Sequence, residues 1–142
     1  MKRIATVTSL EPEAYARRTV TSFDDAGGEV RGDNAKAHGG TGTGPDGFDL
    51  LAAAFGQCML NTLMAILGRE AIPVGAASAE VRHKVRRKAG VAPRISDLDV
   101  QLRVQADLDD EQRTDLFQRA ADECGVHATL APAVHLTGEL TT

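Results

Sequence analysis

Residues 48–70 carry apolar side chains that recur every three or four positions, and this feature constrains the fold more than any other. The spacing predicts one long helix from Phe48 to about Glu70. Gln57, Asn61 and Thr62 interrupt the apolar run, so we expect a buried helix of a soluble protein rather than a membrane span. Small residues on its other sides indicate a helix that neighbouring elements surround.

The segment that precedes this helix, residues 32–47, is rich in glycine. Glycine at this density disfavours both helix and strand, so the segment is predicted to be a loop. Long loops in small domains often have a function. Either Asp46 or Asp49 can cap the helix that follows.

Alternation of apolar and polar residues predicts the strands. We expect a short strand near residues 3–8 and a hairpin of residues 19–23 and 29–31 around an Asp/Gly turn. Further expected elements are strands at 77–88 and 94–107 joined by a turn at 90–93, a helix at 109–124 that starts with acidic residues, and a strand at 133–140. This order predicts an α+β fold in which antiparallel sheets pack with a long central helix. We expect one domain over residues 1–142, with 1–18 as a peripheral N-terminal segment.

The charge of the chain argues against binding to nucleic acids over its whole surface. The net charge is −4 and the pI is about 5.5. A basic run from Arg82 to Lys88 falls on a predicted strand, but no aromatic residues that could stack on bases accompany it. We interpret the run as a solvated strand face, with a nucleic-acid patch as the alternative.

The chain contains only two cysteines, Cys58 and Cys124. The N-terminal residues show no pattern of a secretory signal, so we expect a cytoplasmic protein in a reducing environment. Such a pair is either two inert buried thiols or a redox pair, and the sequence leaves this open. A disulfide would require Cα atoms roughly 4.4–6.8 Å apart. Because no Cys or His residues have metal-ligand spacing, we predict no metal site and no cofactor.

The sequence around each cysteine resembles a segment of the OsmC/Ohr family. Residues 39–58, GGTGTGPDGFDLLAAAFGQC, resemble the glycine-rich loop, helix start and first cysteine of that family. Residues 121–130, ADECGVHATL, are similar to its second-cysteine segment, although Gly47 and Gly125 stand where proline is common. The resemblance covers roughly residues 30–140.

The resemblance implies an intertwined homodimer in which the long central helices pack together and the two thiols lie close. It also implies that Cys58 attacks a hydroperoxide and becomes a sulfenic acid, and that Cys124 then condenses with it to form a disulfide. A dithiol reductant, such as a lipoylated protein, would restore the pair.

The resemblance further implies that an Arg, held by a carboxylate at the helix start, helps to ionise the first cysteine. Asp49 matches the carboxylate, and Arg31 is the best match for the Arg, with Arg17, Arg18 and His38 as alternatives. The alternative to a role at the thiol is that Asp49 is only a helix cap and that Arg31 is only a solvated strand residue. His127, three residues after Cys124, could also favour a thiolate, although a local hydrogen bond is the commoner role.

The leading hypothesis is therefore a thiol-dependent peroxidase that reduces organic hydroperoxides in oxidative-stress defence. Its expected partners are a second copy of the chain, the hydroperoxide and the dithiol reductant, with no nucleic acid and no membrane. The alternatives are a protein of the same family that binds a small apolar molecule at the dimer boundary, and a redox sensor without peroxidase turnover.

Overall fold

The computed structural model describes residues 3–24 and 26–142. Its contacts divide the chain into two compact units, Met1–Leu50 and Leu51–Thr142, and each unit is described by itself. The predicted α+β class with a long helix is confirmed. The assignment of residues 1–142 to one domain, with a peripheral N-terminal segment, stays a prediction.

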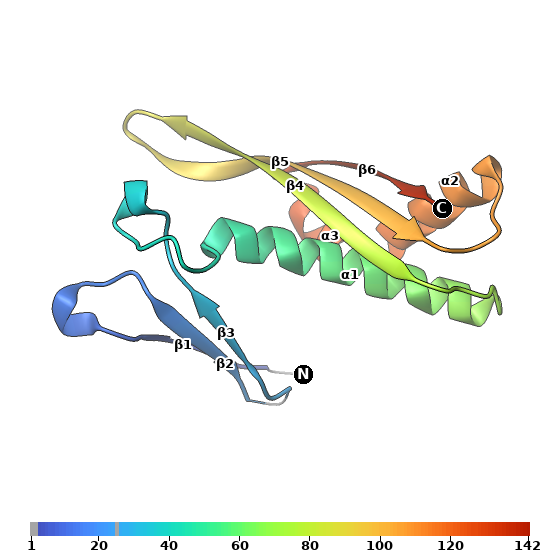
Figure 1. Cartoon of the computed structure of the whole chain (residues 1–142). Coiled ribbons are helices and arrows are strands. Elements are labelled where there is room, and N and C mark those ends of the chain that lie inside the picture. Colours follow the sequence, from blue (N-terminus) through green and yellow to red (C-terminus); the bar gives the residue numbers. More distant parts are fainter. Residues whose placement is uncertain (1–2, 25) are drawn as a thin grey trace. The chain divides into compact units, whose positions relative to one another are not determined.

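The first unit contains a three-stranded antiparallel sheet in the order β1-β2-β3 (Figure 1). The strands are β1 (Ala5–Ser9), β2 (Thr19–Phe23) and β3 (Glu29–Gly32). The expected hairpin of β2 and β3 is confirmed, and Thr21 pairs with Val30 at its centre. Asp25 of the predicted turn lies outside the described residues. A short 3-10 segment, η1 (Pro12–Ala14), lies between β1 and β2, and a second, η2 (Lys36–His38), lies within the predicted glycine-rich loop.

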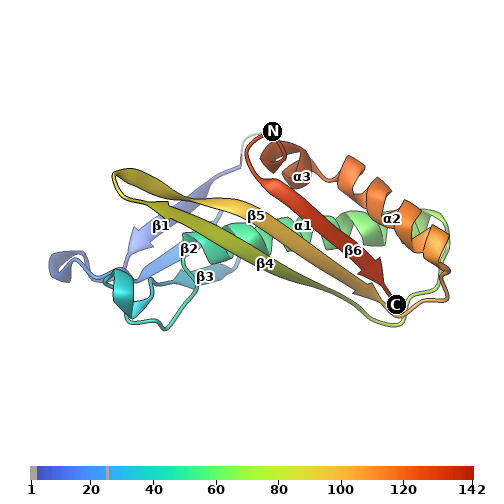
Figure 2. The same ribbon diagram turned by 90° about the horizontal axis from the view of Figure 1, so that it is seen from above.

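The second unit contains a sheet of β4 (Ala77–Lys88), β5 (Val91–Val104) and β6 (His135–Thr141) in that order (Figure 2). β4 and β5 pair antiparallel, as expected. β6 instead pairs parallel to β5, with Leu98 beside Leu136, which corrects the expectation of antiparallel pairing throughout. The two helices between β5 and β6 carry the chain back to the start of β5, and such a crossover produces parallel pairing.

The turn between β4 and β5 is tighter than the sequence indicated. β5 begins at Val91, which pairs with Lys88, and the turn consists of Ala89 and Gly90, whose φ is +75°. The expected turn at 90–93 is therefore wrong, because Pro93 lies inside the strand next to an irregularity in the pairing. Proline is tolerated there because β6 pairs only with residues 97–103, which leaves one side of this part of β5 without a partner strand.

The long helix α1 (Gly47–Arg69) buries one side in the core. At Gly56 the helix approaches β4 so closely that a Cβ atom would lie 2.6 Å from Val81 Cγ2. The sequence indicated a helix surrounded by other elements, but within one chain its opposite side is exposed, and Met64 there is 38% exposed. The buried side consists of Ala52, Phe55, Gly56, Met59, Leu63, Ile66 and Leu67.

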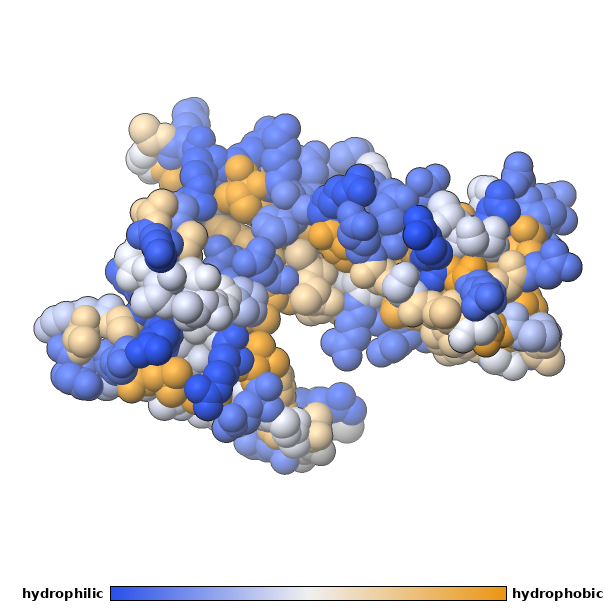
Figure 3. All heavy atoms as spheres, in the orientation of Figure 1, coloured by the Kyte–Doolittle hydropathy of each residue, from blue (hydrophilic) through white to orange (hydrophobic). Residues whose placement is uncertain are grey.

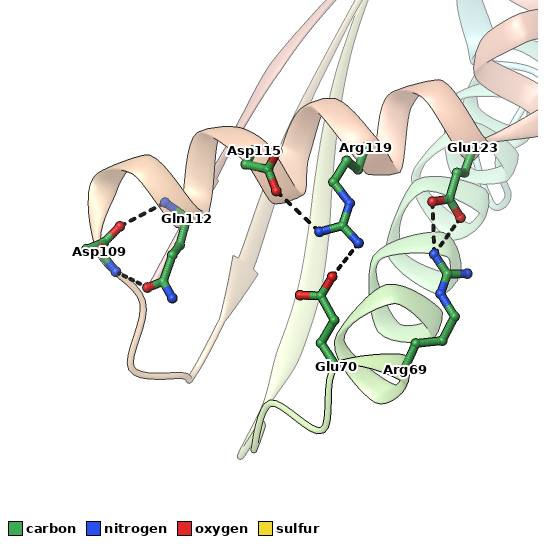
Figure 4. Close-up of polar contacts among 7 residues, drawn as sticks. All are labelled: Arg69, Glu70, Asp109, Gln112, Asp115, Arg119 and Glu123. Carbon is green, nitrogen blue, oxygen red and sulfur yellow. Dashed lines mark hydrogen bonds and ion pairs between the residues drawn. The ribbon is translucent and has the colours of Figure 1, made fainter.

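Two further helices, α2 (Asp110–Glu123) and α3 (Gly125–Leu130), connect β5 to β6. α2 starts with a capping box, in which Asp109 and Gln112 bond to each other's backbone N–H groups (Figure 4). Near its other end, Glu123 forms an ion pair of 2.8 Å with Arg69 at the end of α1. Arg119 adds a second link to α1 through Glu70. These exposed pairs contribute modestly to stability, but they hold the end of α2 beside α1.

The outward face of the second sheet is polar, and hydrophilic residues predominate along the upper part of the space-filling view (Figure 3). Within the basic run, Arg82 forms an ion pair of 2.8 Å with Glu80 and lies opposite Asp99 on β5. Lys84 lies opposite Asp97. Acidic neighbours therefore offset part of the positive charge that the run shows in the sequence.

Among the described residues, α1 is the helix whose length and composition would allow it to cross a membrane. The core helix of a soluble protein has the same properties.

Candidate thiol site

Two structural elements of the second unit carry the two cysteines, and both are free thiols. Cys58 lies in the middle of α1 and is half-buried. Cys124 is 1% exposed and forms the junction between α2 and α3. The N–H of His127 donates to Cys124 Sγ at 3.4 Å, and the N–H of Ala128 donates to the Cys124 carbonyl at 3.0 Å. The first bond holds the Cys124 sulfur, and the second holds its backbone at the start of α3.

The fold brings the two thiols close enough for each to affect the pKa of the other, although 65 residues separate them in the sequence. Burial raises the pKa of Cys58, but hydrogen-bonding groups around its sulfur outweigh that effect and hold the pKa below its ordinary value. These donors are the Cys124 thiol, the Val126 N–H, the Thr62 hydroxyl and the Gly125 N–H. All four donors are neutral.

The pKa of Cys124 moves in the opposite direction. Burial raises it, and the neighbouring Cys58 sulfur raises it further, while the N–H groups of His127 and Val126 oppose the change. Of the two sulfurs, Cys58 is therefore the one that ionises more readily and Cys124 the one that holds its proton more firmly. A thiolate beside a thiol is the arrangement from which a nucleophile and a resolving partner can arise.

The side chain of His127 lies against Phe55, with the ring centroids 6.2 Å apart. Its backbone N–H, rather than its ring, is the group that bonds to Cys124. The local hydrogen bond of the His127 side chain that the sequence favoured stays a prediction. No group of three His, Cys, Asp or Glu side chains that could hold a metal ion occurs within residues 3–24 and 26–142.

The two other predicted site residues belong to the first unit of the chain. Arg31 lies on β3 and is exposed. Asp49 lies in the first turn of α1, where it accepts from the Asp46 N–H at 3.0 Å while Asp46 accepts from the Asp49 N–H at 3.0 Å. This reciprocal pair is a capping box, so the predicted cap is confirmed for both residues. The part that Arg31 and Asp49 would play at the thiols stays a prediction.

The alternative cations also lie in the first unit. Arg18 forms an ion pair of 2.5 Å with Glu11, and this partner raises the pKa of the guanidinium. The Arg17 side chain lies 3.6 Å from the position that a Cβ atom of Gly39 would occupy, and His38 ends the η2 segment.

The glycine-rich loop is organised around Asp33, a residue that sequence reasoning did not single out. Its carboxylate is 4% exposed and accepts bonds from the N–H groups of Asn34, Thr41 and Thr43 and from both threonine hydroxyls. The Thr41 hydroxyl, together with the N–H groups, holds the pKa of Asp33 well below its ordinary value. The signal for it in the sequence is weak, an Asp at the start of a loop that contains two threonines.

Asp33→Asn is expected to lower the melting temperature at pH 7, because an amide presents donors to N–H and O–H groups that need an acceptor. The pKa of Asp33 is lowered in the folded state, so its contribution is complete above the unfolded value of about 4 and is lost as the pH falls below it. Melting curves of both proteins between pH 7 and pH 2 test this. The difference in melting temperature should shrink on acidification, and a difference that stays constant would contradict the role of the charge.

A cavity of about 400 Å³ lies elsewhere in the second unit, between α2 and β6. Arg113 and Phe117 line it from α2, and Gly138 lines it from β6. Neither cysteine borders this cavity, so it is separate from the thiol site.

The family model for OsmC-like proteins matches residues 40–139, which include both cysteines. No curated protein matches the chain. Many solved structures share its fold, among them the following three.

The first is the organic hydroperoxide resistance protein OsmC from Legionella pneumophila, with a TM-score of 0.81 and 13% identity over 100% of this chain and 98% of that one. The OsmC-like protein from Mycoplasma pneumoniae has a TM-score of 0.80 and 13% identity, covering 100% and 99% of the two chains. The organic hydroperoxide resistance protein OhrB of Bacillus subtilis has a TM-score of 0.71 and 20% identity, covering 99% and 98%.

Proposed function

The chain belongs to the family of OsmC-like proteins, and from this premise we propose that it is a thiol-dependent peroxidase that reduces organic hydroperoxides. The family is associated with hydroperoxide resistance and redox stress. The observation that carries the proposal is that two free thiols affect each other's pKa and that the two pKa values move in opposite directions.

The proposed reaction begins with attack of the Cys58 thiolate on the outer oxygen of a hydroperoxide. The O–O bond breaks, the sulfur becomes a sulfenic acid, and the alkoxide takes a proton and leaves as the alcohol. The Cys124 sulfur then attacks the sulfenic sulfur and forms the disulfide, and its proton leaves with the hydroxyl group as water. A dithiol reductant returns both cysteines to thiols and becomes a disulfide itself.

The opposite changes in pKa support the assignment of the two roles. A peroxidatic thiol must ionise near neutral pH, and the pKa of Cys58 is the lowered one, despite the burial that acts against it. The negative charge of the Cys58 sulfur is one cause of the raised pKa of Cys124, after burial. Oxidation of Cys58 to a neutral sulfenic acid removes that charge. Cys124 therefore becomes easier to ionise before it attacks the sulfenic sulfur. A lowered pKa for Cys58 also favours a peroxidase over a protein that only binds a ligand.

We further propose Arg31 as the cation that assists Cys58 and Asp49 as the carboxylate that positions Arg31. Support comes from the family resemblance and from the place of Asp49, nine residues before Cys58 on the same helix.

The proposed partner is a second copy of the chain, which would cover the exposed side of α1. Family members are often dimeric. Leu51 and Met64 are exposed on α1 and would lose contact with water in a dimer that covers them. The proposed reductant is a dithiol, such as a lipoylated protein. The cytoplasm is the proposed location, because a reducing compartment keeps such thiols available.

One equivalent of t-butyl hydroperoxide is expected to join Cys58 to Cys124 within one chain and to release t-butanol. Mass spectrometry of the intact protein should show a loss of two hydrogens, and the digest should contain the linked peptide. A Cys124→Ser variant is the control, since it should instead accumulate sulfenic acid on Cys58. Recovery of both thiols unchanged after exposure would contradict the peroxidase and leave the binding protein as the function to test.

A further inference from the structure

We infer that the end of the β4–β5 hairpin is a docking site for an acidic surface of the protein that supplies the reducing dithiol. This surface, the basic hairpin end, consists of Arg86, Arg87, Lys88 and Arg94. The inference rests on the proposed function, which requires a dithiol reductant, and it assigns the charge of that reductant and the surface that it meets. The basic hairpin end lies wholly within the second unit of the chain.

The hairpin extends beyond the third strand of its sheet (Figure 2). β6 pairs only with residues 97–103 of β5, so the hairpin residues 85–95 pair only with each other. All four basic side chains fall within this part, and all four are exposed. None of them forms an ion pair within residues 3–24 and 26–142. A partner can therefore approach these charges without displacing another strand of the sheet.

The pairing of β4 with β5 distinguishes this end from the rest of the hairpin. Nearer the middle of the sheet, Lys84 lies opposite Asp97. At the hairpin end, Arg86 lies opposite Arg94, and like charges in this position destabilise a strand pair. Charges on an edge strand hinder unwanted pairing with other chains, but charges of mixed sign would do so without this repulsion. Charges of one sign indicate a surface that meets the opposite charge on a partner.

The charge of the remaining chain favours a protein as that partner. The whole chain carries a net charge of −4 and these four residues carry +4, so the rest of the chain carries −8. A nucleic acid is a long, uniform polyanion, and negative surface beyond the hairpin end would repel it. No aromatic residue that could stack on bases occurs among residues 84–95. A compact protein with a local acidic patch can meet the hairpin end alone.

A protein of ordinary size that docks at the hairpin end can also reach the thiol site. α1 approaches β4 at Gly56, two residues before Cys58, where a Cβ atom would lie 2.6 Å from Val81 Cγ2. The strand from Val81 to Arg86 is about 17 Å long at the usual rise per residue. A small domain is about 30 Å across. A dithiol protein on the hairpin end is therefore wide enough to cover Cys58.

The test uses Arg94→Glu, with Arg103→Glu as its matched control. Both residues are exposed on β5, and each substitution reverses one charge. Arg103 lies opposite Ser78, at the other end of the strand. Arg94→Glu places a carboxylate opposite Arg86, so this variant should fold and should melt at or above the wild-type temperature.

Each protein is first converted to its Cys58–Cys124 disulfide, and its reduction by a dihydrolipoylated domain of net negative charge is then timed at low salt. Arg94→Glu should be reduced about fivefold more slowly than the wild type, because charges at the rim of an interface steer association. Arg103→Glu should react at the wild-type rate. The difference should disappear in about 1 M salt, where the Debye length is about 3 Å. With dithiothreitol, an uncharged dithiol, all three proteins should react alike.

Equal rates for the wild type and Arg94→Glu with the acidic domain would overturn the inference. Unequal rates with dithiothreitol would also overturn it, because the substitution would then act on the thiol site itself. A wild-type disulfide that dithiothreitol reduces but the acidic domain does not would have the same consequence. Single-stranded DNA that binds the wild type more tightly than the acidic domain does, and that loses this affinity in Arg94→Glu, would assign the hairpin end to nucleic acids instead.

A chain that forms no disulfide would contradict the proposed function and leave the docking surface to a measurement without redox chemistry. Binding of the same acidic domain, with its thiols alkylated, is then measured by isothermal titration calorimetry. Arg94→Glu should raise the Kd about fivefold and Arg103→Glu should leave it unchanged. An equal Kd for the wild type and Arg94→Glu, or no binding to the wild type, would overturn the inference.

Discussion

Cys58→Ser is expected to abolish dithiol-dependent consumption of t-butyl hydroperoxide, with a loss of about a thousandfold or more in rate. A serine hydroxyl ionises far less readily than a thiol and cannot be oxidised to a sulfenic acid. The donors around residue 58 would remain in place, but they would have no reactive sulfur to stabilise. Peroxide consumption is followed in a coupled assay with excess dithiol, and circular dichroism verifies that the variant is folded.

Cys124→Ser provides the matched control, because it removes the other sulfur of the same pair. This variant should still react with one equivalent of hydroperoxide, since Cys58 is intact. It should then lose activity as Cys58 is oxidised further to sulfinic and sulfonic acids. Full activity of Cys58→Ser would remove Cys58 from the mechanism, whichever result Cys124→Ser gives.

Leu98→Ala is expected to lower the free energy of unfolding by about 3–4 kcal/mol, the largest effect on stability that we predict. Leu98 is 0% exposed, lies on the central strand β5 and pairs with Leu136 on β6 and His83 on β4. Its truncation leaves a cavity that the surrounding side chains fill only in part. Urea denaturation at one fixed protein concentration measures the effect, because a dimer would make stability depend on concentration.

Val91→Ala on the same strand is the control for this substitution. Val91 is 56% exposed, so its truncation should cost less than about 1 kcal/mol. A loss from Leu98→Ala no larger than that from Val91→Ala would contradict the proposed core.

Local pattern predicted the main elements well, because each pattern reflects contacts between near neighbours in the sequence. The helix expected at residues 48–70 is α1, at Gly47–Arg69, and the strand expected at 77–88 has those bounds. The alternation of Leu98, Val100, Leu102 and Val104 identified the buried face of β5, and all four residues are buried. The errors came where distant segments decide the outcome, as at Pro93 and in the parallel pairing of β6.

The sequence by itself determined that this chain has one long apolar helix with a cysteine at its centre, a glycine-rich loop before it and a second cysteine after another helix. Helical spacing, glycine content and strand alternation are properties of consecutive residues, so they can be read without coordinates. Only the tertiary structure decided that Cys58 and Cys124 affect each other's pKa, and that the pKa falls at Cys58 and rises at Cys124. A pKa depends on burial and on donors that come from other segments, here Gly125 and Val126, and no local pattern specifies which segments will meet.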